Sequence, residues 1–265
     1  MERGESMSIL EAVILGIFQG FAEFLPISSS GHLIMLQSFF GIEESTMMFN
    51  IVVHLGTLIP VLVIYRKEVF AIIRQPFQRY TYLLIIATLP AVVVALILGD
   101  NIEALFANVA ILPVSFIITA LLLIYAESRP EGRKSKKDIT YLDSLIIGCT
   151  QAVAIIPGIS RSGSTITMAI SRDFKRDTAA RFSFLMSIPA ICGGFALEVV
   201  RLITTEDPAP GVGTLPLIFG FVTAMLTGFL AIAMLLELIR RRSLRVFSYY
   251  LLALSAVLIV INFMN

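Results

Sequence analysis

The stretch Q-G-F-A-E-F-L-P-I-S-S-S-G-H, residues 19–32, decides how the rest of this chain is interpreted. It lies within a strongly apolar sequence, yet it carries a carboxylate, a proline, three consecutive hydroxyls and a histidine. Because polar groups are costly to bury in hydrocarbon, they require a polar cavity or a ligand. The residues concerned are Glu23, Pro26, Ser28, Ser29, Ser30 and His32.

A second stretch, Q-A-V-A-I-I-P-G-I-S-R-S-G-S at residues 151–164, matches the first one without gaps when it is moved back by 132 positions. The matched pairs are Gly16 with Gly148, Gln19 with Gln151, Ala22 with Ala154, Ser28 with Ser160, Ser30 with Ser162 and Gly31 with Gly163. Because 132 is close to half of the 265 residues, the chain is predicted to contain one unit twice, at about 8–127 and 140–263.

The composition is that of a membrane protein. Hydrophobic residues make up 57% of the chain and charged residues 15%, which leaves too few polar side chains to cover a soluble domain. We therefore expect residues 1–265 to form a single integral membrane domain. The net charge of +1 gives no indication of a nucleic-acid partner, and none is expected. Cys149 and Cys192 are interpreted as small buried apolar residues.

The apolar segments fall into two groups. Six are long enough to cross about 30 Å of hydrocarbon as helices: 46–65, 80–98, 108–127, 179–203, 215–239 and 246–263. The others form two pairs interrupted by proline, and the second member of each pair is too short to cross. These pairs are 8–25 with 30–41, and 140–156 with 162–172. The charged stretch 66–79 is predicted to be a loop.

The basic residues indicate the topology. Of the 20 lysines and arginines, 17 lie in the regions 66–79, 128–139, 172–181 and 240–245. The positive-inside rule places these regions in the cytoplasm, and the acidic connections 99–107 and 204–214 then lie outside.

This topology closes only if both interrupted pairs are re-entrant hairpins that enter from opposite sides. The predicted fold is therefore an all-α polytopic membrane protein with an inverted-topology internal repeat, about six full spans and two re-entrant helical hairpins that meet near the midplane. Ten ordinary short spans are the alternative, but the 12-residue runs and the internal prolines disfavour it.

Two helix N-termini that meet at mid-depth are expected to attract an anion, and phosphate is their usual ligand. The repeat places Arg161 opposite Ser29, and arginine binds phosphate oxygens with paired donors. A charge at a helix end that reaches the membrane surface is the alternative for Arg161. The candidate phosphate-binding residues are Ser28, Ser30, Gly31, Ser160, Ser162 and Gly163.

Reactive groups lie beside these residues. His32 could act as a general acid or base. A single histidine in an apolar segment is more often a packed core residue, but beside three serines, a carboxylate and an arginine we favour a functional role for His32. For His54 we favour the core role. Glu23 follows Gln19 by one helical turn and shares its face. The carboxylate could orient His32 or hold a divalent cation, Mg²⁺ or Ca²⁺, against phosphate, with Gln19 as a second metal ligand.

At these residues the chain resembles the undecaprenyl pyrophosphate phosphatase family, also called the bacitracin-resistance protein family. The matching pieces are Q-G-F-A-E-F-L-P-I-S-S-S-G-H-L and P-G-I-S-R-S-G-S-T, supported by F-N-I-V-V-H-L-G-T-L and A-A-R-F-S-F-L-M-S-I-P. The resemblance covers nearly the whole chain. It implies a bacterial plasma-membrane enzyme that hydrolyses a C55 polyprenyl diphosphate to the monophosphate carrier lipid for cell-wall precursors, which gives bacitracin resistance. It also implies a divalent cation and a site that opens to the outer face.

The resemblance also assigns roles to individual residues. Ser29 matches the proposed nucleophile or hydroxyl contact, His32 the acid/base residue and Arg161 the phosphate-binding arginine. Glu23 matches the second acid of the family's E-x-x-x-E pattern, whose first position is Gln19 here. A neutral amide at that position affects the expected cation more than the reaction class.

Hydrolysis of a lipid diphosphate is the leading hypothesis, and a polyprenyl-phosphate flippase or transporter on the same architecture is the alternative. An acid, a base, a hydroxyl and an arginine together are more than anion binding requires. The sequence leaves open whether a phosphoserine forms or water attacks directly. The oligomeric state, including a homodimer, is open as well.

Overall fold

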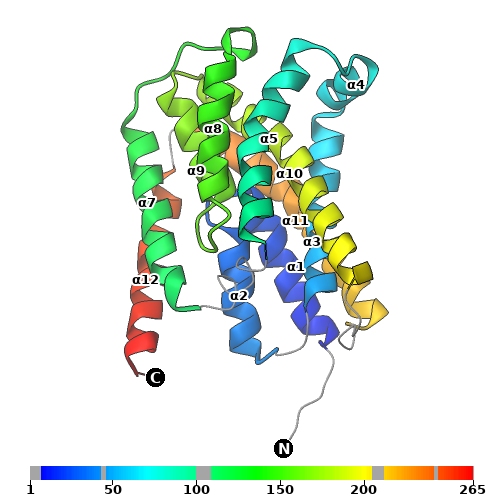
Figure 1. The fold of residues 1–265 in the computed structure, drawn as a ribbon. Helices are drawn as coiled ribbons and strands as arrows, with labels where there is room; N and C mark the ends of the chain where they lie inside the picture. The colour runs from blue at the N-terminus through cyan, green and yellow to red at the C-terminus, as the bar shows by residue number, and fades with distance from the viewer. Residues whose placement is uncertain (1–6, 43–45, 100–108, 205–211, 242–243, 265) are drawn as a thin grey trace, which may run out of the picture.

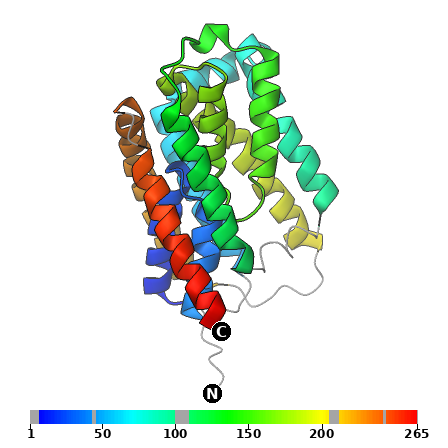
Figure 2. The same ribbon diagram turned by 90° about the vertical axis from the view of Figure 1, so that its left-hand side faces the viewer.

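The computed structural model describes residues 7–42, 46–99, 109–204, 212–241 and 244–264, which form a bundle of helices (Figures 1 and 2). The α-helices of these residues are α1 (Ile9–Phe24), α2 (Ser29–Phe40), α3 (Met47–Ile64), α4 (Arg66–Arg74), α5 (Arg79–Leu98), α7 (Leu112–Ser128), α8 (Tyr141–Val153), α9 (Arg161–Ser171), α10 (Arg176–Thr204), α11 (Thr214–Arg240) and α12 (Arg245–Met264). Short 3-10 turns lie at Val109–Ile111 and Lys136–Asp138.

Six of the described helices are long and apolar enough to cross a membrane: α3, α5, α10, α11, α12, and α7 with the 3-10 turn before it. They confirm the six long segments predicted from the sequence. Leu96, Leu226 and Val257 are each more than half exposed on the outside of the bundle. Apolar side chains can face outward there because lipid replaces water around such helices. The protein is thus a multi-pass membrane protein.

Two predictions at this level were wrong. The stretch 66–79 was predicted to be a loop, but most of it is helix α4, whose Glu68 accepts a hydrogen bond from Arg181 of α10 at 3.1 Å. A contact 113 positions away gives no signal in a local reading of the sequence.

Cys149 and Cys192 were predicted to be buried, yet both are exposed. A small apolar residue need not be inside the protein when its helix faces lipid. Most of the connections 99–107 and 204–214 lies outside the described residues.

Two helical hairpins, α1–α2 and α8–α9, have their turns where proline predicted them. The N-cap side chains of Ser8 and Thr140 form capping boxes at the first helix of each hairpin. In the second helices, the side chains of Ser28 and Ser160 accept hydrogen bonds from the third residue along. Figure 1 shows α1 and α2 in the lower half of the bundle and α8 and α9 in the upper half.

The two turns meet inside the bundle. The Ser162 hydroxyl donates to the carbonyl oxygen of Leu25 at 3.3 Å. A Cβ on Gly31 would lie 2.9 Å from the Cα of Gly158, so only glycine permits this approach of the two backbones. The residues that begin α2 and α9 are thereby brought to one place, although they are far apart in the sequence.

Helix α1 packs so closely against α11 that backbone atoms of the two helices are almost in contact. A Cβ on Gly20 would overlap the Thr227 hydroxyl and the Ala224 carbonyl oxygen of α11. Small residues that permit such contact are a main source of stability between helices in membranes.

We expect Gly20→Ala to lower the free energy of unfolding in detergent by about 1–3 kcal/mol, because the added methyl group must push α1 away from α11. Gly193→Ala in α10 is the matched control, because a Cβ there meets no atom within 4 Å. Thermal unfolding of both variants checks the prediction, and equal stabilities would contradict it.

Candidate active site

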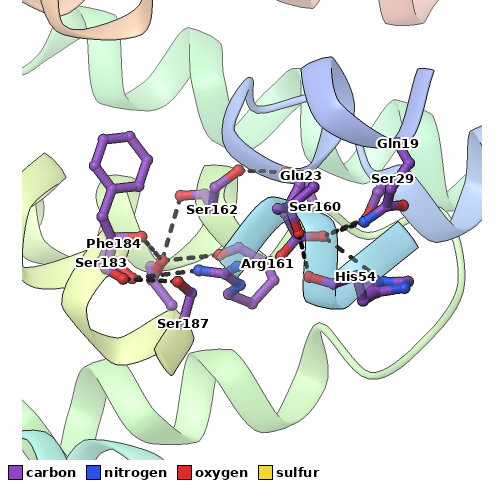
Figure 3. A network of polar contacts seen from close by, with 12 residues as sticks. Gln19, Glu23, Ser29, His54, Ser160, Arg161, Ser162, Ser183, Phe184 and Ser187 are labelled. Carbon is purple, nitrogen blue, oxygen red and sulfur yellow. Dashed lines mark hydrogen bonds and ion pairs between the residues drawn. The ribbon is translucent and has the colours of Figure 1, made fainter. Parts of the chain in front are cut away.

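The Glu23 carboxylate is the centre of the site. It lies at the end of α1 and is 8% exposed. Its Oε1 accepts a hydrogen bond from the Arg161 guanidinium at 2.5 Å. Its Oε2 accepts from the Ser29 hydroxyl at 2.9 Å and from the Gln19 side-chain amide at 3.1 Å (Figure 3). Four residues of the two predicted motifs are therefore joined directly.

Arg161 is the first residue of α9 and is held from a second side. Its other terminal nitrogen donates to the carbonyl oxygen of Ser183 in α10 at 3.2 Å. The Ser183 hydroxyl forms a hydrogen bond of 2.7 Å with the hydroxyl of Thr165, one turn further along α9. Ser183 belongs to the A-A-R-F-S-F stretch, which served above only to support the family resemblance. In the structure this stretch holds the guanidinium beside Glu23.

The serines of the two turns occupy matching positions. Ser28 and Ser30 have their hydroxyls 3.3 Å apart, and Ser160 and Ser162 have theirs 3.2 Å apart. Ser28 and Ser160 also accept hydrogen bonds from the backbone N–H groups of Gly31 and Gly163, which were predicted to bind phosphate. In this structure those two glycine amides are used to cap their own helices.

A small cavity lies between the serines of the first turn and Arg161, whereas Ser160, Ser162, Gly31 and Gly163 are not among its lining residues. Its empty space, open mouth included, is about 250 Å³. A phosphate group fits such a volume, and a long prenyl chain does not. The lining residues are Ala22, Glu23, Ser28, Ser29, Ser30, Ala154, Ile159 and Arg161.

His32 is buried behind this cavity and is absent from its lining. Its Nδ1 lies 2.8 Å from the Ser28 carbonyl oxygen, and its Nε2 lies 2.8 Å from the Tyr250 hydroxyl of α12. A carbonyl oxygen can only accept, so Nδ1 carries the proton and Nε2 accepts from Tyr250. The ring is also stacked on Phe18 and Tyr250. Both ring nitrogens are therefore engaged away from Glu23.

His54 of α3 is the imidazole that contacts Glu23. Its Nε2 lies 3.7 Å from Glu23 Oε2, and its Nδ1 lies 2.7 Å from the Asn50 carbonyl oxygen. Figure 3 shows His54 and Arg161 on opposite sides of the carboxylate. A core role was predicted for His54, and that prediction was wrong. The signals for a site role were a second histidine within an apolar span and its place in the F-N-I-V-V-H-L-G-T-L stretch that supports the resemblance.

The side chains present fit a resident divalent cation poorly. Of the described residues that line the cavity, Glu23 alone carries a carboxylate, and Arg161, Ser29 and Gln19 already contact its oxygens. Within the described parts of the chain, no three histidine, cysteine or acidic side chains lie close enough to hold a metal ion. Gln19 Oε1 is buried without a hydrogen-bond partner, but one neutral amide oxygen does not make a cation site.

Fold and cavity together define a class: a polytopic helical membrane protein with a small cavity inside the bundle that is lined by an arginine, a carboxylate and three serines. The chain belongs to the family described as bacitracin resistance protein BacA, whose model matches residues 12–257.

Relatives of the chain carry a common name. It is 44% identical over 256 residues to an undecaprenyl-diphosphatase of Carboxydothermus hydrogenoformans, a match that covers 97% of this chain and 98% of the relative. Undecaprenyl-diphosphatase 3 of Bacillus cereus is 40% identical over 257 residues, with the same coverage. An undecaprenyl-diphosphatase of Methanosphaera stadtmanae is 34% identical over 278 residues, which cover 97% of this chain and 99% of that relative.

Proposed function

We propose that this protein is an undecaprenyl-diphosphatase. It hydrolyses the phosphoric anhydride of a C55 polyprenyl diphosphate, leaves the monophosphate carrier lipid for cell-wall precursors, and thereby supports resistance to bacitracin. The observation that carries the proposal is the direct contact of Arg161 and Ser29 with Glu23 in one cavity of phosphate size. The full-length similarity to relatives of that name supports it.

The geometry supports a mechanism in which Arg161 holds the terminal phosphate and Ser29, or a water in its place, attacks the terminal phosphorus in line. The anhydride P–O bond breaks, and its electron pair remains on the lipid monophosphate. On the Ser29 route, a water then attacks the phosphoserine, which releases inorganic phosphate and regenerates the Ser29 hydroxyl. The Ser29 hydroxyl already donates to Glu23 Oε2, so Glu23, with His54 beside it, receives the proton. Arg161 and the N-termini of α2 and α9 stabilise the negative charge of the transition state, which is the largest contribution in most phosphoryl transfers.

The cation enters this proposal with the substrate. Mg²⁺ is commonly bound through one or two carboxylates together with substrate phosphates. Because Glu23 is already engaged, we propose that a cation, Mg²⁺ or Ca²⁺, would be held mainly by the phosphates of the substrate, with Glu23 and Gln19 as its protein contacts, and would there neutralise part of the diphosphate charge.

We further propose that the two halves are inverted repeats and that α1–α2 and α8–α9 are re-entrant hairpins. The caps of Ser8 and Thr140, and of Ser28 and Ser160, recur 132 positions apart. The hairpins approach from opposite ends of the bundle in Figure 1. The end with α4 and the basic loop 128–139 would face the cytoplasm of a bacterial cell, and the cavity would open to the outer face of the plasma membrane.

Phosphate release from a C55 diphosphate by the purified protein in detergent tests the activity, with Mg²⁺, Ca²⁺ or a chelator in parallel. Cation-dependent release is expected. If no phosphate appears under any condition, the enzyme hypothesis fails, and movement of labelled polyprenyl phosphate across vesicles would then test the flippase alternative.

The two histidines are expected to differ when each is replaced by alanine. Loss of His54 should lower turnover by about 10²-fold without changing the unfolding temperature, because its ring is partly exposed beside Glu23. Loss of His32 should lower both turnover and the unfolding temperature, because it removes the hydrogen bonds to Ser28 and Tyr250 that hold the start of α2. Turnover and thermal unfolding of both variants check this. If His32→Ala lost turnover at an unchanged unfolding temperature, His32 would have a chemical role.

A further inference from the structure

The arginine of the cavity is bound to a carboxylate of the same protein. Arg161 donates to Glu23 at 2.5 Å, and the side chains of both residues are mostly buried, with exposures of 17% and 7%. A phosphate group that enters the cavity needs the same guanidinium, since Arg161 is the only basic residue among the described residues that line it. Arg161 Nη1 donates to Ser183 and Nη2 to Glu23, so a ligand that takes both terminal nitrogens must displace Glu23.

This competition depends on charge. Removing the cationic partner of a buried carboxylate is strongly unfavourable. A ligand can take Arg161 only if it attracts the guanidinium more strongly than Glu23 does. A terminal phosphate, with up to two charges and three free oxygens, meets this condition, whereas a phosphodiester with one charge does not.

Other contacts keep Glu23 in position when Arg161 turns away. The Ser29 hydroxyl and the Gln19 amide donate to Oε2, the oxygen that Arg161 does not use. His54 lies 3.7 Å from that same oxygen. The carboxylate thus stays where it can bind Arg161 again.

We propose that Glu23 is a specificity-determining residue that competes with ligands for Arg161, restricts the cavity to terminal phosphate groups and returns Arg161 to its resting contact when inorganic phosphate leaves. The proposal rests on the proposed function for its substrate, but its central claim concerns anion binding. α1 supplies the competitor and α9 supplies the arginine, so the contact between the two hairpins is itself the selective element.

Calorimetric titration of inorganic phosphate and dimethyl phosphate into the detergent-purified protein tests the proposal. Glu23→Gln keeps the size of the side chain and removes its charge, so phosphate should bind at least about 10-fold more tightly than to the unmodified protein. Dimethyl phosphate should become a measurable ligand. Arg161→Ala in the Glu23→Gln background should abolish both gains, which separates competition for Arg161 from a general loss of negative charge.

Glu23→Asp is the second variant, since it retains a charge but draws it back from Arg161; an intermediate tightening is expected. Thermal unfolding verifies that each variant is folded. Phosphate binding that is unchanged or weaker in folded Glu23→Gln would overturn the proposal, as would a gain that survives Arg161→Ala. These measurements need no turnover. Tighter binding in Glu23→Gln without phosphate release by the unmodified protein would thus reject the proposed function and retain this inference.

Discussion

Replacing Arg161 with alanine is expected to abolish phosphate release, with kcat/KM lower by at least about 10³-fold. Within the described part of the chain, the Arg161 guanidinium is the only cation in the cavity lining, and phosphoryl transfer depends on a cation to stabilise the negative charge of its transition state. Arg161→Lys should recover little of the activity, because a single ammonium cannot reproduce paired donors that are fixed against Ser183 and Glu23.

The measurement is phosphate release from the C55 diphosphate at several substrate concentrations, so that kcat and KM are obtained separately. Arg133→Ala is the matched control. Its guanidinium is 89% exposed and pairs with Asp173 at the surface, where an ion pair contributes little. An Arg161→Ala protein within 10-fold of the unmodified enzyme would place the phosphate site elsewhere.

Replacing Ser29 with alanine is expected to separate the two chemical routes. If the Ser29 hydroxyl is the nucleophile, turnover should fall on the order of 10³-fold or more, since the attacking oxygen is gone. If water attacks and Ser29 only orients it through Glu23, the loss should be about 10-fold. The geometry favours the larger effect, because the hydroxyl donates directly to the carboxylate that would accept its proton.

Ser38→Ala is the control for Ser29→Ala, because Ser38 is an exposed serine of the same helix. Rapid quenching followed by mass spectrometry of the peptide that contains residue 29 would detect a phosphoserine directly. Near-normal turnover of Ser29→Ala would exclude the covalent route.

The spans and the breaks could be predicted because they depend on local composition: long apolar runs, internal prolines and basic flanks. The joining of Arg161 to Glu23 was also within reach, since the 132-position repeat brings the two turns together in principle. Which of the two histidines contacts Glu23 could not be predicted. His32 lies beside the motif serines in sequence, yet its rotation about α2 turns the ring toward Tyr250, 218 positions away. His54 reaches Glu23 only because α3 packs against α1. Such contacts depend on tertiary packing, which periodicity alone does not specify.

The backbone at Ser28 differs from its counterpart in the second turn. Ser28 has a φ of 71°, a backbone angle that residues other than glycine rarely adopt, whereas Ser160 has a φ of −71°. Such a conformation costs about 1–3 kcal/mol and persists when the surroundings impose it. A laboratory screen for heat resistance alone should therefore enrich glycine at position 28, because glycine removes the strain, and it should yield hardier proteins that turn over more slowly. In this protein, the backbone angle at residue 28 would then set a balance between thermal stability and turnover rate.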